Sequence, residues 1–150
     1  MRRALLVLLL AGCVSDGRGL APGADAAAVR AEMGRPAEIM ALPQGGEAWF
    51  FPRGRAGRQT FRAELGSDGR LRAIEQVLDE AHFDRILDNK TSAEEVRRLI
   101  GPPNYVYPVF GGTEVWEYRY NWGAQQAFAL RVGVGRDGIV TGQSRVRLRA

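Results

Sequence analysis

The feature that most constrains the fold is an internal repeat. Trp49 and Trp116 stand 67 positions apart. The same spacing pairs Val29 with Val96, Arg30 with Arg97, Gly34 with Gly101, Pro36 with Pro103, Glu47 with Glu114, Gln59 with Gln126 and Phe61 with Phe128. Asp68-Gly69 matches Asp137-Gly138 at a spacing of 69, so the second copy is two residues longer there. We interpret residues 25–78 and 79–150 as two copies of one unit.

Each copy is predicted to contain a capped helix. Thr91 and Glu94 form a capping box in the second copy, and Asp25 is the equivalent N-cap in the first. Val96, Leu99 and Ile100 then fall on one helix face. Gly34 and Gly101 suit a helix C-cap with positive φ, and Pro36 and Pro103 prevent continuation. Residues 79–87 predict a second short helix, with Phe83, Ile86 and Leu87 facing inward.

Strands follow the helices. Residues 114–122 alternate, with Trp116, Tyr118, Tyr120 and Trp122 on one face, and residues 128–134 alternate in the same way. The Asp-Gly pairs predict tight hairpin turns that each lead into a third strand. The expected fold class is α+β, a tandem repeat of helix-helix-three-stranded antiparallel sheet units that pack as one compact body. In the first copy a Gly-rich segment occupies the place of the opening helix.

The N-terminus predicts export. Arg2 and Arg3 precede an apolar run over residues 4–11, which is too short to cross a bilayer. Residues 1–12 are therefore interpreted as a signal peptide. Leu10-Ala11-Gly12-Cys13 resembles the bacterial lipobox, which implies that the Cys13 thiol is acylated and that residues 13–24 form a lipidated, flexible tether. An uncleaved signal anchor is the less favoured alternative.

The same resemblance also predicts which membrane the lipoprotein is attached to. In the Gram-negative sorting rule, Asp directly after the acylated cysteine retains a lipoprotein at the inner membrane. Val14 stands there in this chain. We therefore expect the periplasmic face of the outer membrane.

Charge argues against a nucleic-acid partner. Removal of Arg2 and Arg3 lowers the formal net charge from +4 to +2, and Lys90 is the sole lysine. Acidic residues are interspersed throughout, and no dense basic block occurs.

The succession of cap, helix, Gly-x-Pro, Gly-Gly turn, Trp-centred strand and Phe-centred strand behind a lipobox resembles the SmpA/OmlA (BamE-like) family of outer-membrane assembly lipoproteins. The doubled form is also similar to the β-lactamase-inhibitor-protein superfamily. The resemblance covers roughly residues 25–148. It implies a membrane-tethered scaffold that binds envelope proteins, including β-barrel assembly components, and in some members anionic phospholipid.

No set of residues predicts catalysis. One cysteine and one histidine, His82, cannot supply a metal site, and no cofactor motif occurs. The serines lack a hydrolase motif, and Glu94 and Glu117 are interpreted as a capping residue and a solvated strand position. A non-enzymatic role without cofactor is therefore expected.

Candidate binding residues are aromatic or basic. Tyr107, Phe110, Tyr120 and Trp122 are candidate partner contacts, since aromatic residues dominate interface hot spots. Two interpretations of 105–110 are equally open: an exposed loop that binds a partner, or a sheet edge that completes the core. Arg53, Arg55 and Arg58 flank the first hairpin and are candidates for lipid phosphates, or simply keep the turn soluble.

The leading hypothesis is a non-catalytic outer-membrane lipoprotein that acts as a protein-binding scaffold in β-barrel assembly or envelope integrity. The alternative is a periplasmic inhibitory or binding module that captures an envelope enzyme. Exposed aromatics on an open sheet face would favour capture, and those at one end or loop would favour the scaffold. A cell-wall hydrolase would need a cleft where glutamates converge.

Overall fold

A computed structural model of the protein describes residues 15–123 and 126–149. The expected signal peptide and the expected lipidation site Cys13 lie outside the described residues. No helix in the described ranges is both long enough and apolar enough to cross a membrane.

Two four-stranded antiparallel sheets form the body of the molecule. Sheet 1 contains β1 Glu38–Ala41, β2 Glu47–Arg53, β3 Gln59–Leu65 and β4 Leu71–Gln76, in that order. Sheet 2 contains β5 Tyr105–Val109, β6 Thr113–Trp122, β7 Gln126–Val134 and β8 Val140–Arg147, also in chain order. The helices are short: α1 Ala26–Met33, α2 Glu80–Phe83, α3 Ala93–Ile100 and a 3₁₀ turn, η1 Arg55–Gly57.

The expected α+β class, with units of two helices and three strands, is wrong: the fold is mostly β, and each unit has four strands. The sequence patterns did not predict the first strand of each unit, β1 and β5. β1 is only four residues long, and β5 contains Pro108. Both lie at a sheet edge, where proline is tolerated because its missing N–H can face away from the ladder. The second helix, predicted over residues 79–87, is only one turn long in the structure, α2.

Of the other local predictions, the turns and the helix ends are confirmed, whereas the capping box and the position of Leu87 are wrong. Both Asp-Gly turns connect antiparallel strands, with φ of 71° at Gly69 and 75° at Gly138. Gly34 and Gly101 terminate α1 and α3 with φ of 79° and 84°. The capping box of α3 is displaced by one residue from the prediction, because Ser92 and Glu95 form it. Leu87, expected to face inward, is half exposed.

The two units are equivalent in detail. The isolated bridges Asp25–Arg70 and Ser92–Ile139 occupy matching positions. The indole of Trp49 donates to Glu47, and that of Trp116 donates to Glu114, each over 2.7 Å. Arg30 and Arg97 lie over these two rings, at 4.4 and 5.8 Å from the centroids. The residues that match at the repeat spacing therefore serve the fold.

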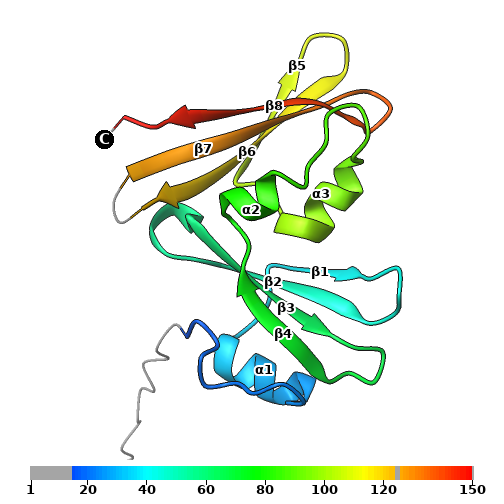
Figure 1. Ribbon diagram of the computed structural model, residues 1–150, viewed down its shortest axis with the longest axis vertical. Coiled ribbons are helices and arrows are strands. Elements are labelled where there is room, and N and C mark those ends of the chain that lie inside the picture. The colour runs from blue at the N-terminus through cyan, green and yellow to red at the C-terminus, as the bar shows by residue number, and fades with distance from the viewer. Residues whose placement is uncertain (1–14, 124–125, 150) are drawn as a thin grey trace, which may run out of the picture.

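The elements stack in four layers: α1, sheet 1, the α2–α3 layer and sheet 2 (Figure 1). One core lies between α1 and sheet 1, and contains Val29, Met33, Trp49 and Phe51. A second lies between α2, α3 and sheet 2, and contains Phe83, Val96, Ile100, Trp116, Tyr118 and Tyr120. Leu42, Ala48 and Phe50 form a third cluster on the other face of sheet 1.

The α3 helix covers that other face of sheet 1. Arg97 pairs with Glu38 over 2.6 Å, the Arg98 side chain donates to the carbonyl of Ala41, and Arg62 donates to the carbonyl of Arg98. Sheet 1 is thus covered on both faces, whereas no helix of the described chain covers the outer face of sheet 2.

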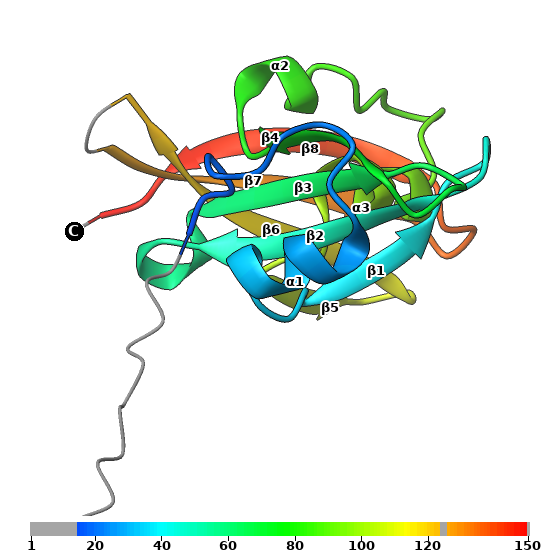
Figure 2. The same cartoon turned by 90° about the horizontal axis from the view of Figure 1, so that it is seen from below.

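The segment 15–24 lies beside α1 on sheet 1, as the view from below shows (Figure 2). Its backbone pairs with the start of β4, because Gly23 donates to the carbonyl of Leu71 and Leu71 donates to that of Ala24. Leu20 packs against the first core, and Ser15 bonds to the carboxylate of Glu32. These contacts attach the entering chain to the first unit.

Candidate functional site

The candidate site is the outer face of sheet 2, which the register defines. Tyr105 lies opposite Glu117, and Tyr107 lies opposite Val115, so these side chains share one face. Arg131 lies opposite Glu117 on the next strand and adds its side chain to the same face. Trp116, Tyr118 and Tyr120 alternate with these positions and fill the core on the other side.

The repeat explains how this face differs from its counterpart. At the spacing of 67, Glu117 corresponds to Phe50, which is fully buried beneath α3. Tyr105 and Tyr107 correspond to Glu38 and Met40, and Glu38 pairs with Arg97 of α3. The positions that contact the covering helix α3 in sheet 1 therefore carry different residues on the outer face of sheet 2.

A charged triad occupies the centre of the face. Glu117 is only 1% exposed, although it lies on the uncovered side. Its two carboxylate oxygens accept from the Nε atoms of Arg119 and Arg131, each over 3.1 Å. The hydrogen bond to Glu117 is the main cause that raises the pKa of Arg119 above its ordinary value. The two arginines screen the carboxylate from water, and the triad keeps one positive charge in excess.

Tyrosines flank the triad. The Arg119 guanidinium lies 4.4 Å from the centroid of the Tyr105 ring, and the rings of Tyr105 and Tyr107 stack with centroids 6.1 Å apart. A cation–π contact of this kind holds the arginine side chain toward β5. Tyrosine and arginine side by side are typical of interface hot spots.

The exposed edge strand of sheet 2, β5, is the second feature of the candidate site. All five residues of β5 are exposed, although all five are apolar or aromatic. Tyr105, Tyr107 and Val109 face the triad side. β5 pairs only with β6, so its other edge lacks a strand partner within the described chain. An apolar edge strand offers unpaired backbone groups to a further strand. The equivalent strand, β1, alternates between partly buried and exposed residues.

The four residues that we predicted to contact a partner lie in four different places. Tyr107 lies on the outer face, and Phe110 is fully exposed in the β5–β6 turn. Trp122 is half exposed at the far end of β6, where its ring lies 5.9 Å from that of Phe128. Tyr120 is buried, and its hydroxyl donates to Glu80 over 2.9 Å, so this residue belongs to the core. The stretch 105–110, left open by the sequence, is a sheet edge that remains exposed.

The three predicted basic residues also separate. Arg53 donates to the backbone oxygens of Ser15, Pro52 and Met33, so it joins the entering segment to sheet 1. Arg55 and Arg58 line a different cavity, together with arginines from the end of β8. Sequence proximity alone had grouped Arg53 with the other two.

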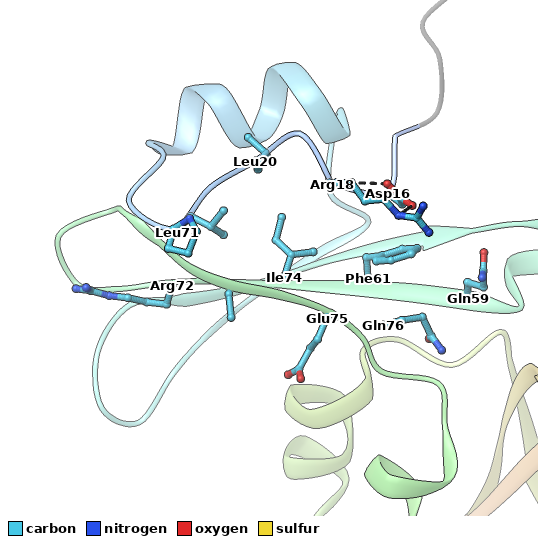
Figure 3. Close-up of a pocket in the computed structure, with 13 residues that line it drawn as sticks. Asp16, Arg18, Leu20, Gln59, Phe61, Leu71, Arg72, Ile74, Glu75 and Gln76 are labelled. Atoms are coloured by element: carbon cyan, nitrogen blue, oxygen red, sulfur yellow. Dashed lines mark hydrogen bonds and ion pairs between the residues drawn. The ribbon is translucent and has the colours of Figure 1, made fainter.

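A groove with a mixed apolar and polar lining lies between segment 15–22 and sheet 1. It has a volume of about 640 Å³. Phe61 and Ile74 point toward the segment, whereas Glu75 points to the opposite face (Figure 3). In the second unit Gln143, the counterpart of Ile74 at the spacing of 69, donates to the carbonyls of Phe83 and Ile86. The groove is thus the space that the α2 region fills in the second unit.

Glutamates converge at one further cavity, of about 470 Å³, between α3 and sheet 1. Arg62 pairs with Glu64 at 2.9 Å and with Glu75 at 3.5 Å, and Glu95 caps α3. Nδ1 of His82 lies 2.7 Å from Asp79, the N-cap of α2. Each carboxylate therefore has a structural partner. Within residues 15–123 and 126–149, no group of three or more His, Cys, Asp or Glu side chains is arranged to hold a metal ion.

Fold and site together define a two-unit, mostly β protein with one uncovered sheet face that carries tyrosines and arginines. Comparisons with protein-family models, with curated proteins and with solved structures found no match for this chain.

Proposed function

We propose that the chain is a non-catalytic, lipid-anchored envelope protein that binds another envelope protein through sheet 2. The binding surface consists of strand β5 and the adjoining outer face with Tyr105, Tyr107, Arg119 and Arg131. The partner is a periplasmic protein or the periplasmic part of a β-barrel assembly component. The SmpA/OmlA resemblance of the sequence motifs supports this class of partner.

The observation that carries the proposal is the exposure of β5. Five consecutive exposed residues, with an unpaired edge, form an aggregation hazard unless the edge is used. A partner segment that adds as a further strand would satisfy the backbone and bury the tyrosine rings. Arg119, which lies over Tyr105, would then meet the side chains of that segment.

The position of the surface suits a tethered binder. The described chain starts beside α1, at the opposite end of the layer stack from sheet 2 (Figure 1). An acylated Cys13, two residues before Ser15, would hold the first unit toward the membrane. The outer face of sheet 2 would then point away from the lipid, toward periplasmic partners.

Site-specific photocrosslinking in cells tests the proposal. The crosslinker replaces Val106 on β5, and the matched control replaces Ile39, its counterpart on β1. These two residues are exposed to similar extents, 48% and 41%. We expect a discrete adduct with an envelope protein from position 106 and none from position 39. Equal adducts from both positions, or none from position 106, would contradict the proposed surface.

Localisation is tested separately. Cys13→Ala is expected to leave the protein unprocessed or soluble, because the acyl chains supply the membrane affinity. Membrane fractionation with globomycin-type inhibition of lipoprotein processing as a control distinguishes the two results. Recovery of unchanged membrane-bound protein after Cys13→Ala would contradict lipid anchoring.

A capture or inhibitory module is the second candidate, and one observation favours it. Tyr105 and Tyr107 lie on the open face of a sheet rather than in a loop. If the crosslinked partner is an enzyme, we expect the purified protein to lower its activity and Tyr107→Ser to relieve that effect. An assembly partner with no change in any activity would favour the scaffold.

A further inference from the structure

A cavity of about 820 Å³ lies between the two units at one end of the molecule. Arg55 and Arg58 line it from the β2–β3 turn, and Arg147 and Arg149 line it from the end of β8. Both views place this turn at the same end of the molecule as the end of β8 (Figures 1 and 2). The other lining residues, Gln126, Ala127 and Leu148, carry no charge.

The four arginines differ from the ion-paired arginines of the described chain. Arg62, Arg97, Arg119 and Arg145 each pair with carboxylates, but none of the four in the cavity forms an ion pair with a described residue. In addition, Nε of Arg58 is buried without a hydrogen-bond partner in the described part of the chain. A buried donor without a partner is costly, and neighbouring like charges repel one another. An anion in the cavity would offset the repulsion among the four positive charges that line it.

We propose that this cavity binds a phosphate group, held by arginines from both units. A guanidinium donates two parallel hydrogen bonds to an oxyanion, and several guanidinium groups suit an anion with three or four oxygens better than a single carboxylate. The phosphate belongs either to free inorganic phosphate or to the headgroup of an anionic lipid. This site is separate from the sheet 2 surface and does not depend on the proposed function.

The assignment changes the grouping that the sequence suggested. Arg53 is committed to backbone oxygens near Ser15, so it lies outside the site. Arg147 and Arg149 join Arg55 and Arg58 only because the second unit packs beside the first hairpin. A bound phosphate would therefore stabilise the contact between the units.

Arginine side-chain NMR of the full-length protein tests phosphate binding without any substitution. Inorganic phosphate is titrated in detergent micelles, with chloride at matched ionic strength as the control. We expect saturable shifts of the Nε–Hε signals of Arg58 and Arg147, with weaker affinity as salt rises. Absence of saturable shifts at both residues would overturn the proposal.

Matched variants then assign the contacts. Arg58→Gln and Arg147→Gln are each expected to weaken phosphate affinity by about tenfold, the usual effect of losing a charge-assisted hydrogen bond. Arg136→Gln, an exposed arginine in the β7–β8 turn, is the control and should bind as the wild type does. Circular dichroism verifies that each variant is folded. Equal affinity in all three variants would overturn the assignment.

Bicelles identify the source of the phosphate. The Arg58 and Arg147 signals are compared in phosphatidylcholine bicelles with and without phosphatidylglycerol. Shifts that require phosphatidylglycerol and reverse with inorganic phosphate indicate a headgroup site. Shifts with inorganic phosphate alone indicate a site for the free ion. Signals that respond to neither anion would overturn the proposal.

Discussion

At the scale of the residue, one repeat position shows how the covered face of sheet 1 differs from the uncovered face of sheet 2. Phe50 is apolar and lies beneath α3, whereas its counterpart Glu117 lies on the uncovered face of sheet 2. The sequence pattern predicted a solvated Glu117, but the side chain is buried. Arg119 and Arg131 compensate the lost hydration by hydrogen bonds from two sides. Alternation along one strand could not reveal this pairing, because Arg131 belongs to the next strand.

Glu117→Gln tests the triad. The variant leaves Arg119 and Arg131 with a neutral acceptor, and we expect it to lower the free energy of unfolding by about 2 kcal/mol. Arg131→Gln is the matched partner change, and a loss of about 1 kcal/mol or less is expected, because its side chain is 45% exposed and water screens it. Urea unfolding at constant pH measures both. An equal loss in the two variants would contradict a triad centred on the buried carboxylate.

The buried phenol of Tyr118 is expected to make the free energy of unfolding fall at high pH. Burial raises the pKa of its phenol far above the ordinary value of 10.0, and its hydroxyl donates to the carbonyl of Gly101 over 3.1 Å. The folded state therefore keeps the phenol neutral while the unfolded state ionises. Stability from this residue is fully present below about pH 10 and is lost as the pH rises further.

Urea midpoints between pH 8 and pH 11.5, a range of about 3.5 units around the free tyrosine pKa, measure this loss. The wild type should lose stability above about pH 10, and Tyr118→Phe should show a flatter profile. Tyr107→Phe removes a phenol at an exposed position and is the matched control. An unchanged slope in Tyr118→Phe would contradict the assignment.

At the scale of the element, two helix ends test how the units pack. Gly34 and Gly101 end α1 and α3 with nearly the same backbone angles, φ 79° and ψ −158° against φ 84° and ψ −165°. These angles are essentially restricted to glycine. A Cβ at Gly34 would meet no atom within 4 Å, whereas one at Gly101 would lie 2.7 Å from the Phe50 ring.

The pair Gly34→Ala and Gly101→Ala therefore isolates the contact between the units. Backbone strain should cost both variants about 1–3 kcal/mol. Gly101→Ala should lose about 1–3 kcal/mol more, because Phe50 lies in the tightly packed third cluster. Thermal or urea unfolding provides the comparison. Equal losses would indicate that α3 can move away from sheet 1 without cost.

Elements differed in how far the sequence could predict them. The period-2 patterns of β6 and β7, the internal repeat and the Asp-Gly turns together predicted the last three strands of each unit. The amino-acid sequences of β1 and β5 lack such a pattern: β1 has only four residues, and all five residues of β5 are apolar or aromatic. β1 and β5 form because the backbones of β2 and β6 supply hydrogen-bond partners for them. The capping box shifted by one residue because Thr91-Ser92 offers two candidate caps.

At the scale of the whole molecule, α3 belongs to both units. Val96 and Ile100 pack into the second core, while Arg97 and Arg98 bond to sheet 1. The α3 layer therefore joins the two units, and the second unit cannot unfold without uncovering Phe50. A cooperative transition is expected for a body connected in this way.

Single-tryptophan variants test this cooperativity. One variant retains Trp49 of the first unit and the other retains Trp116 of the second, with phenylalanine at the remaining tryptophan positions. We expect fluorescence midpoints in urea that coincide with each other and with circular dichroism. Separated midpoints, with the first unit persisting after the second has unfolded, would contradict a shared layer.

The amino-acid sequence by itself determined the doubling, the Trp-centred and Phe-centred strands and the helix ends, because each depends on spacing or on residues a few positions apart. It also contained the basic-then-apolar leader and Cys13, on which the membrane proposal rests. Only the tertiary structure decided that α3 covers sheet 1 and that sheet 2 keeps an open face with Glu117 between two arginines. The four-arginine cavity likewise arises from residues about ninety positions apart. Such groupings depend on which surfaces bury each other, and no local pattern along the chain encodes that choice.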